Sequence, residues 1–189
     1  DPDGPQHLID TTISHYGRLD VLVNNAGISR VLPAVDDDIE GFRHEIEVDL
    51  IAPYELARRA ARWWIANDHP GVVVNLGSVL GEGSGGRLRL PGYAAAKGGL
   101  HNLTRELATQ WARKGIRVNA LAPAWFETEM NSDTMFHDDA GIAYVESGTP
   151  MGRGGMAHEL DGALLLLASD AGSYMAGHVL LVDGGWTSV

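Results

Sequence analysis

The chain has 189 residues, 44% of them hydrophobic and 21% charged, and it contains no cysteine. Its 25 acidic and 14 basic residues give a formal net charge of −11, which argues against a nucleic acid or an anionic membrane surface as partner because both select basic proteins. The lack of cysteine excludes disulfides, thiolate chemistry and cysteine-ligated zinc within this sequence. This composition is typical of a single globular domain, here residues 1–189.

No hydrophobic stretch is long enough to span a bilayer, which takes about 20 apolar residues. The longest leucine-rich run covers only residues 163–168. The first residues are polar and acidic and do not resemble a signal peptide, so a cytoplasmic location is expected. The absence of methionine at position 1 hints at a clipped chain.

Helical and strand patterns alternate along the chain. Apolar or β-branched runs predict strands at residues 19–23, 72–76, 116–121 and 179–182, because strands buried on both faces are almost continuously apolar. Helices are predicted at residues 8–15, ending at Gly17, and at residues 39–66, kinked near Pro53. Further helices are predicted along residues 100–111, stopping at Gly115, and at residues 158–168.

This alternation predicts an α/β fold, with right-handed crossovers and a parallel sheet covered on both sides. Two segments do not follow this alternation of strands and helices. Residues 81–92 are glycine-rich and predict a flexible loop, and residues 123–155 show neither helical nor strand periodicity. Both follow the carboxyl ends of predicted strands, where open α/β sheets bind ligands. They are therefore candidates for substrate loops.

Tyr93 and Lys97 lie four residues apart on a predicted helix, so their side chains share one face. A nearby ammonium group favours the phenolate and lowers the phenol pKa, as a general base requires. An isolated pair of this kind is usually a surface pair. Ser78 just after the second predicted strand strengthens the catalytic interpretation, although a serine there also suits a turn or helix cap.

Five motifs in order resemble the short-chain dehydrogenase/reductase family, from about residue 8 to the C-terminus. They are residues 24–27 (NNAG), 74–78 (VNLGS), 93–97 (YAAAK), 116–123 (IRVNALAP) and 177–185 (GHVLLVDGG). The resemblance implies a Rossmann-like, doubly wound parallel sheet. Compared with that family, the first three strands and two helices are absent from this sequence, so the first strand here would be a sheet edge.

The resemblance also implies an oxidoreductase that transfers a hydride between NAD or NADP and a secondary alcohol or ketone of the 3-oxoacyl, sugar or polyol type. Tyr93 would be the acid–base catalyst and Ser78 would orient the substrate oxygen. Lys97 would lower the Tyr93 pKa and hold the nicotinamide ribose. A dehydratase or epimerase that uses the same tyrosine is a lower-ranked alternative.

Cofactor-binding positions carry over in the same way: Asn25, Ala26 and Gly27 beneath the adenine ribose, and Pro123, Ala124 and Thr128 beside the nicotinamide, together with Tyr93 and Lys97. Gly27 has a physical reason, because a backbone close to a ligand leaves no room for Cβ. The alternative for Gly27 is a simple turn after the strand.

The sequence departs from the family at Asp49, where the family has an asparagine whose backbone carbonyl holds a water leading to the lysine. An added carboxylate there would weaken the pull of Lys97 on Tyr93, which predicts residual activity and a faster Asp49→Asn variant at neutral pH. Ala124 replaces the family glycine. The interval from Ser78 to Tyr93 is slightly long, consistent with an inserted glycine-rich loop.

The strand, glycine-rich turn and helix that receive a dinucleotide pyrophosphate do not precede residues 19–23. Two interpretations follow: a fragment of a complete oxidoreductase, which we favour, or a short non-catalytic subunit or interaction module. The choice between NAD and NADP rests on residues not in this sequence. Relatives assemble as homodimers or homotetramers, for which Trp63 and Trp64 are plausible anchors, although core packing explains them equally well. The scattered histidines predict no metal site.

Overall fold

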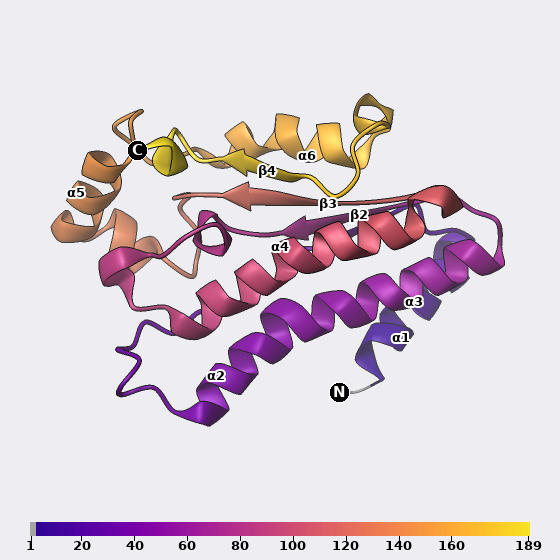
Figure 1. Ribbon diagram of the computed structural model, residues 1–189, viewed down its shortest axis with the longest axis horizontal. Helices are drawn as coiled ribbons and strands as arrows, with labels where there is room; N and C mark the ends of the chain where they lie inside the picture. The colour runs from indigo at the N-terminus through magenta and orange to yellow at the C-terminus, as the bar shows by residue number, and fades with distance from the viewer. Residues whose placement is uncertain (1–2) are drawn as a thin grey trace.

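The structure is a computed structural model that describes residues 3–189, without the side chains of Arg87 and Thr134. Within these residues, four parallel strands form one sheet in the order β1-β2-β3-β4 (Figure 1). The strands are β1 (Val21–Asn24), β2 (Gly71–Leu76), β3 (Ile116–Pro123) and β4 (Val179–Val182). All four predicted strands are therefore confirmed, and β1 lies at an edge of the described sheet as expected.

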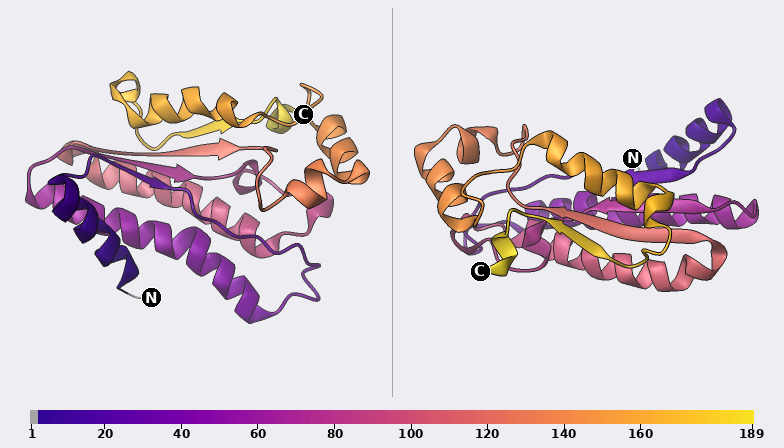
Figure 2. Two further views of the ribbon diagram at one scale, coloured as in Figure 1. Left: turned by 180° about the vertical axis from the view of Figure 1, so that it is seen from behind. Right: turned by 90° about the horizontal axis from the view of Figure 1, so that it is seen from above.

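Helices cover both faces of the sheet, as the alternating pattern predicts. One face carries α1 (Gly4–Tyr16), α3 (Ala52–Ala66) and α4 (Pro91–Trp111), while α6 (Asp161–Ala168) packs on the other face (Figures 1 and 2). Two further helices are α2 (Ile39–Ile46), which packs against α4, and α5 (Asp139–Gly148), which lies beyond the carboxyl ends of the strands. This is the α/β parallel-sheet fold expected from the sequence.

The core beneath α3 and α4 is centred on Trp64, which is completely buried. Its indole Nε1 donates to the Leu19 carbonyl at 2.7 Å, and its ring lies so close to Gly71 that a Cβ there would approach within 2.2 Å. Trp64 is therefore a core residue and not an interface anchor. Its neighbour Trp63 is only half-buried.

The long helix predicted at residues 39–66 is interrupted by a π-helical turn, Glu47–Ile51. Pro53 lacks an N–H, so it cannot give the Asp49 carbonyl the donor that an α-helix would supply. The backbone instead widens, and the Ala52 N–H donates to the Glu47 carbonyl. The interruption expected near Pro53 is confirmed, and it lies around Asp49. Single-turn π segments of this kind are frequent at functional sites.

The two irregular segments contain more structure than predicted. Residues 123–155 include α5, whose N-cap Asp138 accepts the Gly141 N–H at 2.9 Å. Residues 81–92 are not one flexible loop, because they include a 3₁₀ turn (Gly86–Leu88) and the start of α4. Tyr144 ties the segments together, since its hydroxyl donates to the Gly85 carbonyl at 3.1 Å.

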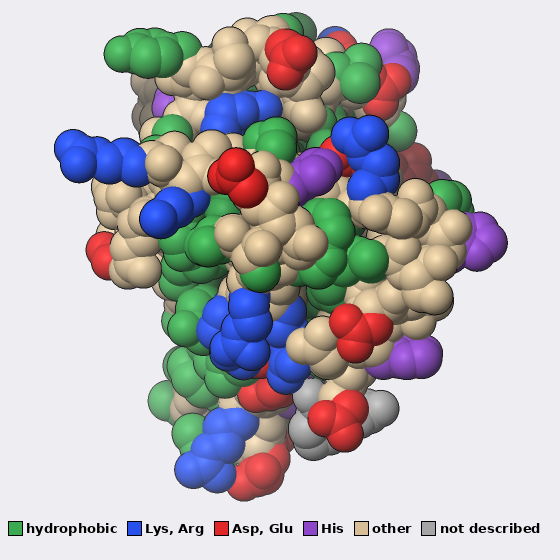
Figure 3. All heavy atoms as spheres, turned by 90° about the vertical axis from the view of Figure 1, so that its right-hand side faces the viewer, with side chains coloured by type: hydrophobic (Ala, Val, Ile, Leu, Met, Phe, Trp, Pro, Cys, Tyr) green, Lys and Arg blue, Asp and Glu red, His purple; other side chains and the backbone are tan. Residues whose placement is uncertain are grey.

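The face at the amino ends of the strands carries basic, acidic and histidine side chains among hydrophobic ones (Figure 3). Among residues 3–189, no helix is both long and apolar enough to cross a membrane. The carboxyl ends of the strands lie on the opposite side of the molecule, close to α5 and the C-terminus (Figure 1).

Replacing Trp64 by phenylalanine tests the buried indole hydrogen bond. We expect Trp64→Phe to lower the free energy of unfolding by about 1–3 kcal/mol, because it leaves the Leu19 carbonyl without its donor. Urea denaturation followed by far-ultraviolet circular dichroism measures this loss. The matched control is Trp63→Phe, for which we expect a smaller loss; equal losses for the two variants would contradict this account.

Candidate active site

Tyr93 and Lys97 lie on one face of α4, and Ser78 lies two residues beyond the end of β2. The Lys97 Nζ is 5.3 Å from the centre of the Tyr93 ring. Lys97 and Ser78 are only 3% and 7% exposed, whereas Tyr93 is half-buried. The structure therefore brings together the three side chains that the sequence singled out, at the carboxyl end of the sheet.

The Lys97 ammonium is buried and has two compensating contacts. Its Nζ donates to the Leu76 carbonyl at 2.9 Å and lies 3.6 Å from Asp49 Oδ1. Burial lowers the pKa of Lys97, and the Asp49 carboxylate opposes that shift. A buried ammonium without such partners would be costly. The end of β2 and the π-helical turn therefore hold this charge in place together.

Asp49 is completely buried, and its two carboxylate oxygens differ. Oδ1 accepts the Ile28 N–H at 3.2 Å, whereas Oδ2 has no hydrogen-bond partner among the described residues. Burial raises the pKa of Asp49, while Lys97 and the Ile28 N–H act in the opposite direction. The carboxylate lies beside Lys97, as the family resemblance led us to expect.

Burial raises the pKa of Tyr93 to about 12. A hydrogen bond with Ser78 lowers this pKa, and the Asp49 carboxylate raises it. The phenol is consequently protonated at neutral pH and able to donate a proton. The Asp49 effect has the sign that the sequence analysis expected, but the expected lowering of the Tyr93 pKa is not found, because burial outweighs it.

Ser78 combines the two interpretations left open by the sequence. It is the N-cap of a short 3₁₀ turn (Val79–Gly81), where its Oγ accepts the Leu80 N–H at 3.1 Å. It also interacts with the Tyr93 phenol. Capping the turn therefore leaves the Ser78 hydroxyl in contact with the Tyr93 phenol.

Sequence reasoning did not select His101, which is 1% exposed and lies against the Ser78 turn. The Ser78 N–H points at His101 Nε2 at 3.4 Å, and His101 Nδ1 is 2.8 Å from Glu82 Oε1. One signal was available, because residues 93, 97 and 101 follow each other at four-residue spacing on a single helical stripe.

The segment after β1 contains the positions expected beneath the cofactor. Asn25 and Ala26 are exposed, whereas Asn24 is buried and donates to Asn75 Oδ1 at 2.8 Å. A Cβ at Gly27 would lie 2.7 Å from Asp49 Oδ1 and 3.5 Å from Lys97 Nζ. Gly27 is therefore required by the Asp49–Lys97 pair itself, which the sequence did not reveal.

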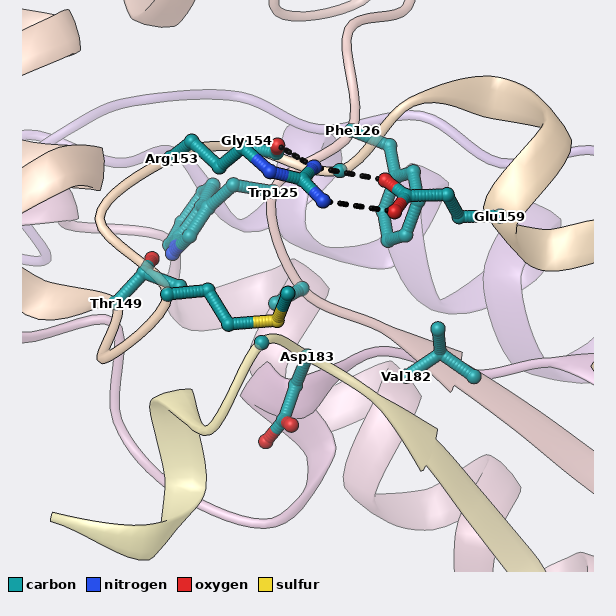
Figure 4. A pocket seen from close by; sticks show the side chains of 12 residues that line it. Trp125, Phe126, Thr149, Arg153, Gly154, Glu159, Val182 and Asp183 are labelled. Atoms are coloured by element: carbon teal, nitrogen blue, oxygen red, sulfur yellow. Dashed lines mark hydrogen bonds and ion pairs between the residues drawn. The ribbon is translucent and has the colours of Figure 1, made fainter.

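Thr128 is exposed beyond β3, and both its N–H and its hydroxyl donate to Asn131 Oδ1, at 2.8 and 3.1 Å. Pro123 ends β3, and Ala124 lines a cavity of about 80 Å³ at the carboxyl ends of β3 and β4. Figure 4 shows this cavity, with the Arg153–Glu159 ion pair on one side.

The aromatic side chains of this region pack mainly on one another. Trp125, Tyr144 and Trp186 form edge-to-face contacts, with ring centres 5.1 to 5.8 Å apart. Met135 and Phe136 join the same small cluster. Trp125 Nε1 and Thr149 Oγ1 are buried and have no hydrogen-bond partner within the described residues. Packing within the loops therefore accounts for these aromatics.

The residues present fit the nicotinamide end of a dinucleotide. Lys97 has three N–H donors, of which one binds Leu76 while Asp49 lies 3.6 Å away, and Gly27 adds no side chain beside this pair. Within residues 3–20 the described chain contains α1 but no strand that could open a pyrophosphate-binding turn. No cluster of three or more His, Cys, Asp or Glu side chains suited to a metal occurs among residues 3–189.

Comparisons with known proteins identify the class of enzyme that this chain resembles. A family model described as "Enoyl-(Acyl carrier protein) reductase" matches residues 1–187. The chain is 33% identical over 184 residues to the 2-dehydro-3-deoxy-D-gluconate 5-dehydrogenase of Escherichia coli (strain K12), covering 97% of this chain and 72% of that protein. It is 40% identical over 167 residues to the galactitol 2-dehydrogenase (L-tagatose-forming) of Cereibacter sphaeroides, covering 88% and 65%.

Among solved structures, a gluconate 5-dehydrogenase from Burkholderia cenocepacia J2315 in complex with NADP and tartrate superposes with a TM-score of 0.92 at 38% identity, covering 98% of this chain and 71% of that one. The site and these matches together define a nicotinamide-dependent dehydrogenase acting on CH–OH groups. The chain belongs to the short-chain dehydrogenase/reductase family.

Replacing Asp49 by asparagine tests its influence on Tyr93. The variant removes a carboxylate that raises the Tyr93 pKa, so more of the phenol is ionised at neutral pH. We expect alcohol oxidation at pH 7 to be about three- to tenfold faster, since one pKa unit changes the ionised fraction tenfold. The pH profile of cofactor reduction, with gluconate or galactitol as test substrate, measures this.

Glu47→Gln is the control for Asp49→Asn, because it removes an exposed carboxylate from the same π-helical turn. We expect its profile to match that of the unmodified chain. An Asp49→Asn profile that also matches would exclude a role for this side chain.

Proposed function

We propose that this chain oxidises a secondary hydroxyl group of a sugar acid or polyol to the ketone, reversibly, with NAD or NADP as hydride acceptor. The relatives reported above act on gluconate derivatives or galactitol according to their names. These compounds share secondary hydroxyl groups, and the Ser78 hydroxyl and the Tyr93 phenol, side by side, can both contact the oxygen of one such group. The observation that carries the proposal is the buried Lys97 ammonium beside Tyr93, with Ser78 against the same phenol.

Tyr93 would move the proton. In the oxidising direction its phenolate oxygen accepts the proton of the substrate hydroxyl as the carbonyl forms, and in the reducing direction the phenol returns it. Bound nicotinamide supplies the hydride acceptor or donor. Ser78 Oγ would donate a hydrogen bond to the same substrate oxygen and so fix its position between the two side chains.

Lys97 would serve both the proton and the cofactor. Its positive charge stabilises a phenolate on Tyr93, and its N–H groups not used by Leu76 are suited to ribose hydroxyls. Asn25, Ala26 and Gly27 would line the adenine-ribose side, and Pro123, Ala124 and Thr128 the nicotinamide side. Thr128 is exposed, and its hydroxyl would give up its hydrogen bond to Asn131 and form one with the cofactor instead.

The same proposal covers location and assembly. We place this chain in the cytoplasm as a dehydrogenase that uses the nicotinamide pool there, and we expect it to form a homodimer or homotetramer, as relatives of this family do. The non-catalytic alternative is less favoured, because the relatives are enzymes by name and the three reactive side chains meet at one site.

Purified protein tests the proposal directly. We expect reduction of NAD or NADP, followed by absorbance, when gluconate, 2-dehydro-3-deoxy-D-gluconate or galactitol is added. Tyr93→Phe should lower kcat by about 10²- to 10⁴-fold, the usual contribution of a positioned proton donor. Saturable nucleotide binding without turnover of any of these compounds or of simple secondary alcohols would contradict the proposed activity.

A matched control comes from Tyr144→Phe. This substitution removes a phenolic hydroxyl that bonds the Gly85 carbonyl in the neighbouring loop and lies outside the proposed proton path. We expect its kcat to stay within about threefold of the unmodified chain, since one neutral hydrogen bond contributes only about 1 kcal/mol. If Tyr93→Phe and Tyr144→Phe lost kcat equally, the loss would be due to altered packing and not to the removal of a proton donor.

A further inference from the structure

His101 is a buried titratable group that the mechanism above does not use. It lies on α4 one turn beyond Lys97, and it is 1% exposed. Its Nε2 faces the Ser78 N–H at 3.4 Å, and its Nδ1 faces Glu82 Oε1 at 2.8 Å. The imidazole therefore joins the backbone of Ser78 to a partly exposed carboxylate.

The turn after β2 is shaped around this ring. A Cβ at Gly77 would lie 2.2 Å from His101 Nε2, and a Cβ at Gly81 would lie 2.6 Å from His101 Cε1. Distances under about 3 Å do not occur between real atoms of this kind. The glycines on both sides of Ser78 thus leave the space that the imidazole occupies, which makes the contact a built feature of the turn.

The two partners determine the protonation state of the ring. A carboxylate only accepts hydrogen bonds, so Glu82 requires a proton on His101 Nδ1. A backbone N–H only donates, so Ser78 requires a lone pair on Nε2. Both requirements are met by a single form, the neutral imidazole protonated at Nδ1. The doubly protonated ring would set an N–H against the Ser78 N–H.

We propose that His101, held by Glu82, is a positioning residue that fixes the Ser78 turn by accepting the Ser78 N–H. The proposal rests on the function given above, because it makes the placement of the Ser78 hydroxyl on substrate depend on the imidazole. His101 acts through Ser78 and does not itself touch the reacting atoms.

The charges around His101 favour this neutral form. Burial lowers the pKa of His101 most, the Glu82 carboxylate raises it, and Arg105 and Lys97 on the same helix lower it. Arg105 also lies 3.5 Å from the Glu82 oxygen that His101 contacts. The imidazole in the folded chain therefore stays neutral at neutral pH. The folding stability that depends on the neutral ring is lost as the pH falls from the ordinary histidine pKa, which applies to the unfolded chain, through the lowered pKa of the folded chain.

Two substitutions separate positioning from packing. His101→Leu replaces the imidazole with an apolar side chain of similar volume and leaves the Ser78 N–H without an acceptor. We expect kcat to fall by about ten- to a hundredfold, because misplacement of a reacting group has effects of this size. The KM for the nucleotide should change little. In His101→Gln the side-chain oxygen can replace Nε2, so we expect most of kcat to return.

Leu107→Ala provides the stability control, because Leu107 is buried on α4 within the core cluster under α1 and α3. His101→Leu should lose far more kcat than Leu107→Ala does at a comparable loss of Tm. Equal kcat values for these two variants, or no recovery in His101→Gln, would overturn the proposal.

The pH profile gives a second readout. The unmodified chain should lose kcat at acid pH as His101 is protonated, and His101→Gln should lack that step while keeping the alkaline dependence that belongs to Tyr93. An acid step that persists unchanged in His101→Gln would overturn the proposal.

A third measurement does not need catalytic activity, so it separates failure of this inference from failure of the proposed function. Nitrogen-15 NMR of the labelled histidines reports the tautomer, and the His101 signals are those missing in His101→Gln. We expect a neutral ring protonated at Nδ1 at pH 7, and faster hydrogen exchange of the Ser78 amide in His101→Leu. A charged ring at pH 7, or a ring protonated at Nε2, would overturn the inference.

Discussion

The buried ammonium of Lys97 is the charge around which the rest of the site is arranged. A cation that is only 3% exposed needs nearby negative or dipolar partners, and it finds them in the Leu76 carbonyl and the Asp49 carboxylate. Each partner comes from a different element. The end of β2, the π-helical turn and α4 must therefore keep their mutual positions for the ammonium to remain charged, and Gly27 must remain without a side chain beside them.

The π-helical turn places one of these partners beside the ammonium. Pro53 prevents an α-helix from continuing through Asp49, and the helix widens into a π turn at that point. Asp49 lies within the widened turn, completely buried beside Lys97. The π-helical turn between α2 and α3 is thus where the carboxylate partner of the ammonium is located.

The fold and the reactive trio were predictable because their signals are local. Four apolar runs predict buried parallel strands, and Tyr93 and Lys97 at four-residue spacing share a helical face whatever the fold. The partners of His101 were not predictable, because Glu82 and the Ser78 N–H reach it only after α4 packs against the turn following β2. Helix α5 was missed because Gly141 in its first turn weakens the helical pattern, although Asp138 supplies a regular N-cap.

Asp49 raises the pKa of both of its ionisable neighbours, and this has different consequences for the charge of each. Its carboxylate raises the pKa of Lys97 and so keeps the ammonium charged, but it also raises the pKa of Tyr93. A charged Lys97 beside a protonated phenol is the combination that suits proton donation to a carbonyl. Proton removal from an alcohol instead requires the phenolate, which burial and Asp49 both disfavour. Burial and Asp49 therefore keep the phenol protonated at neutral pH, and the positive charge of an oxidised nicotinamide would act in the opposite direction, toward the phenolate.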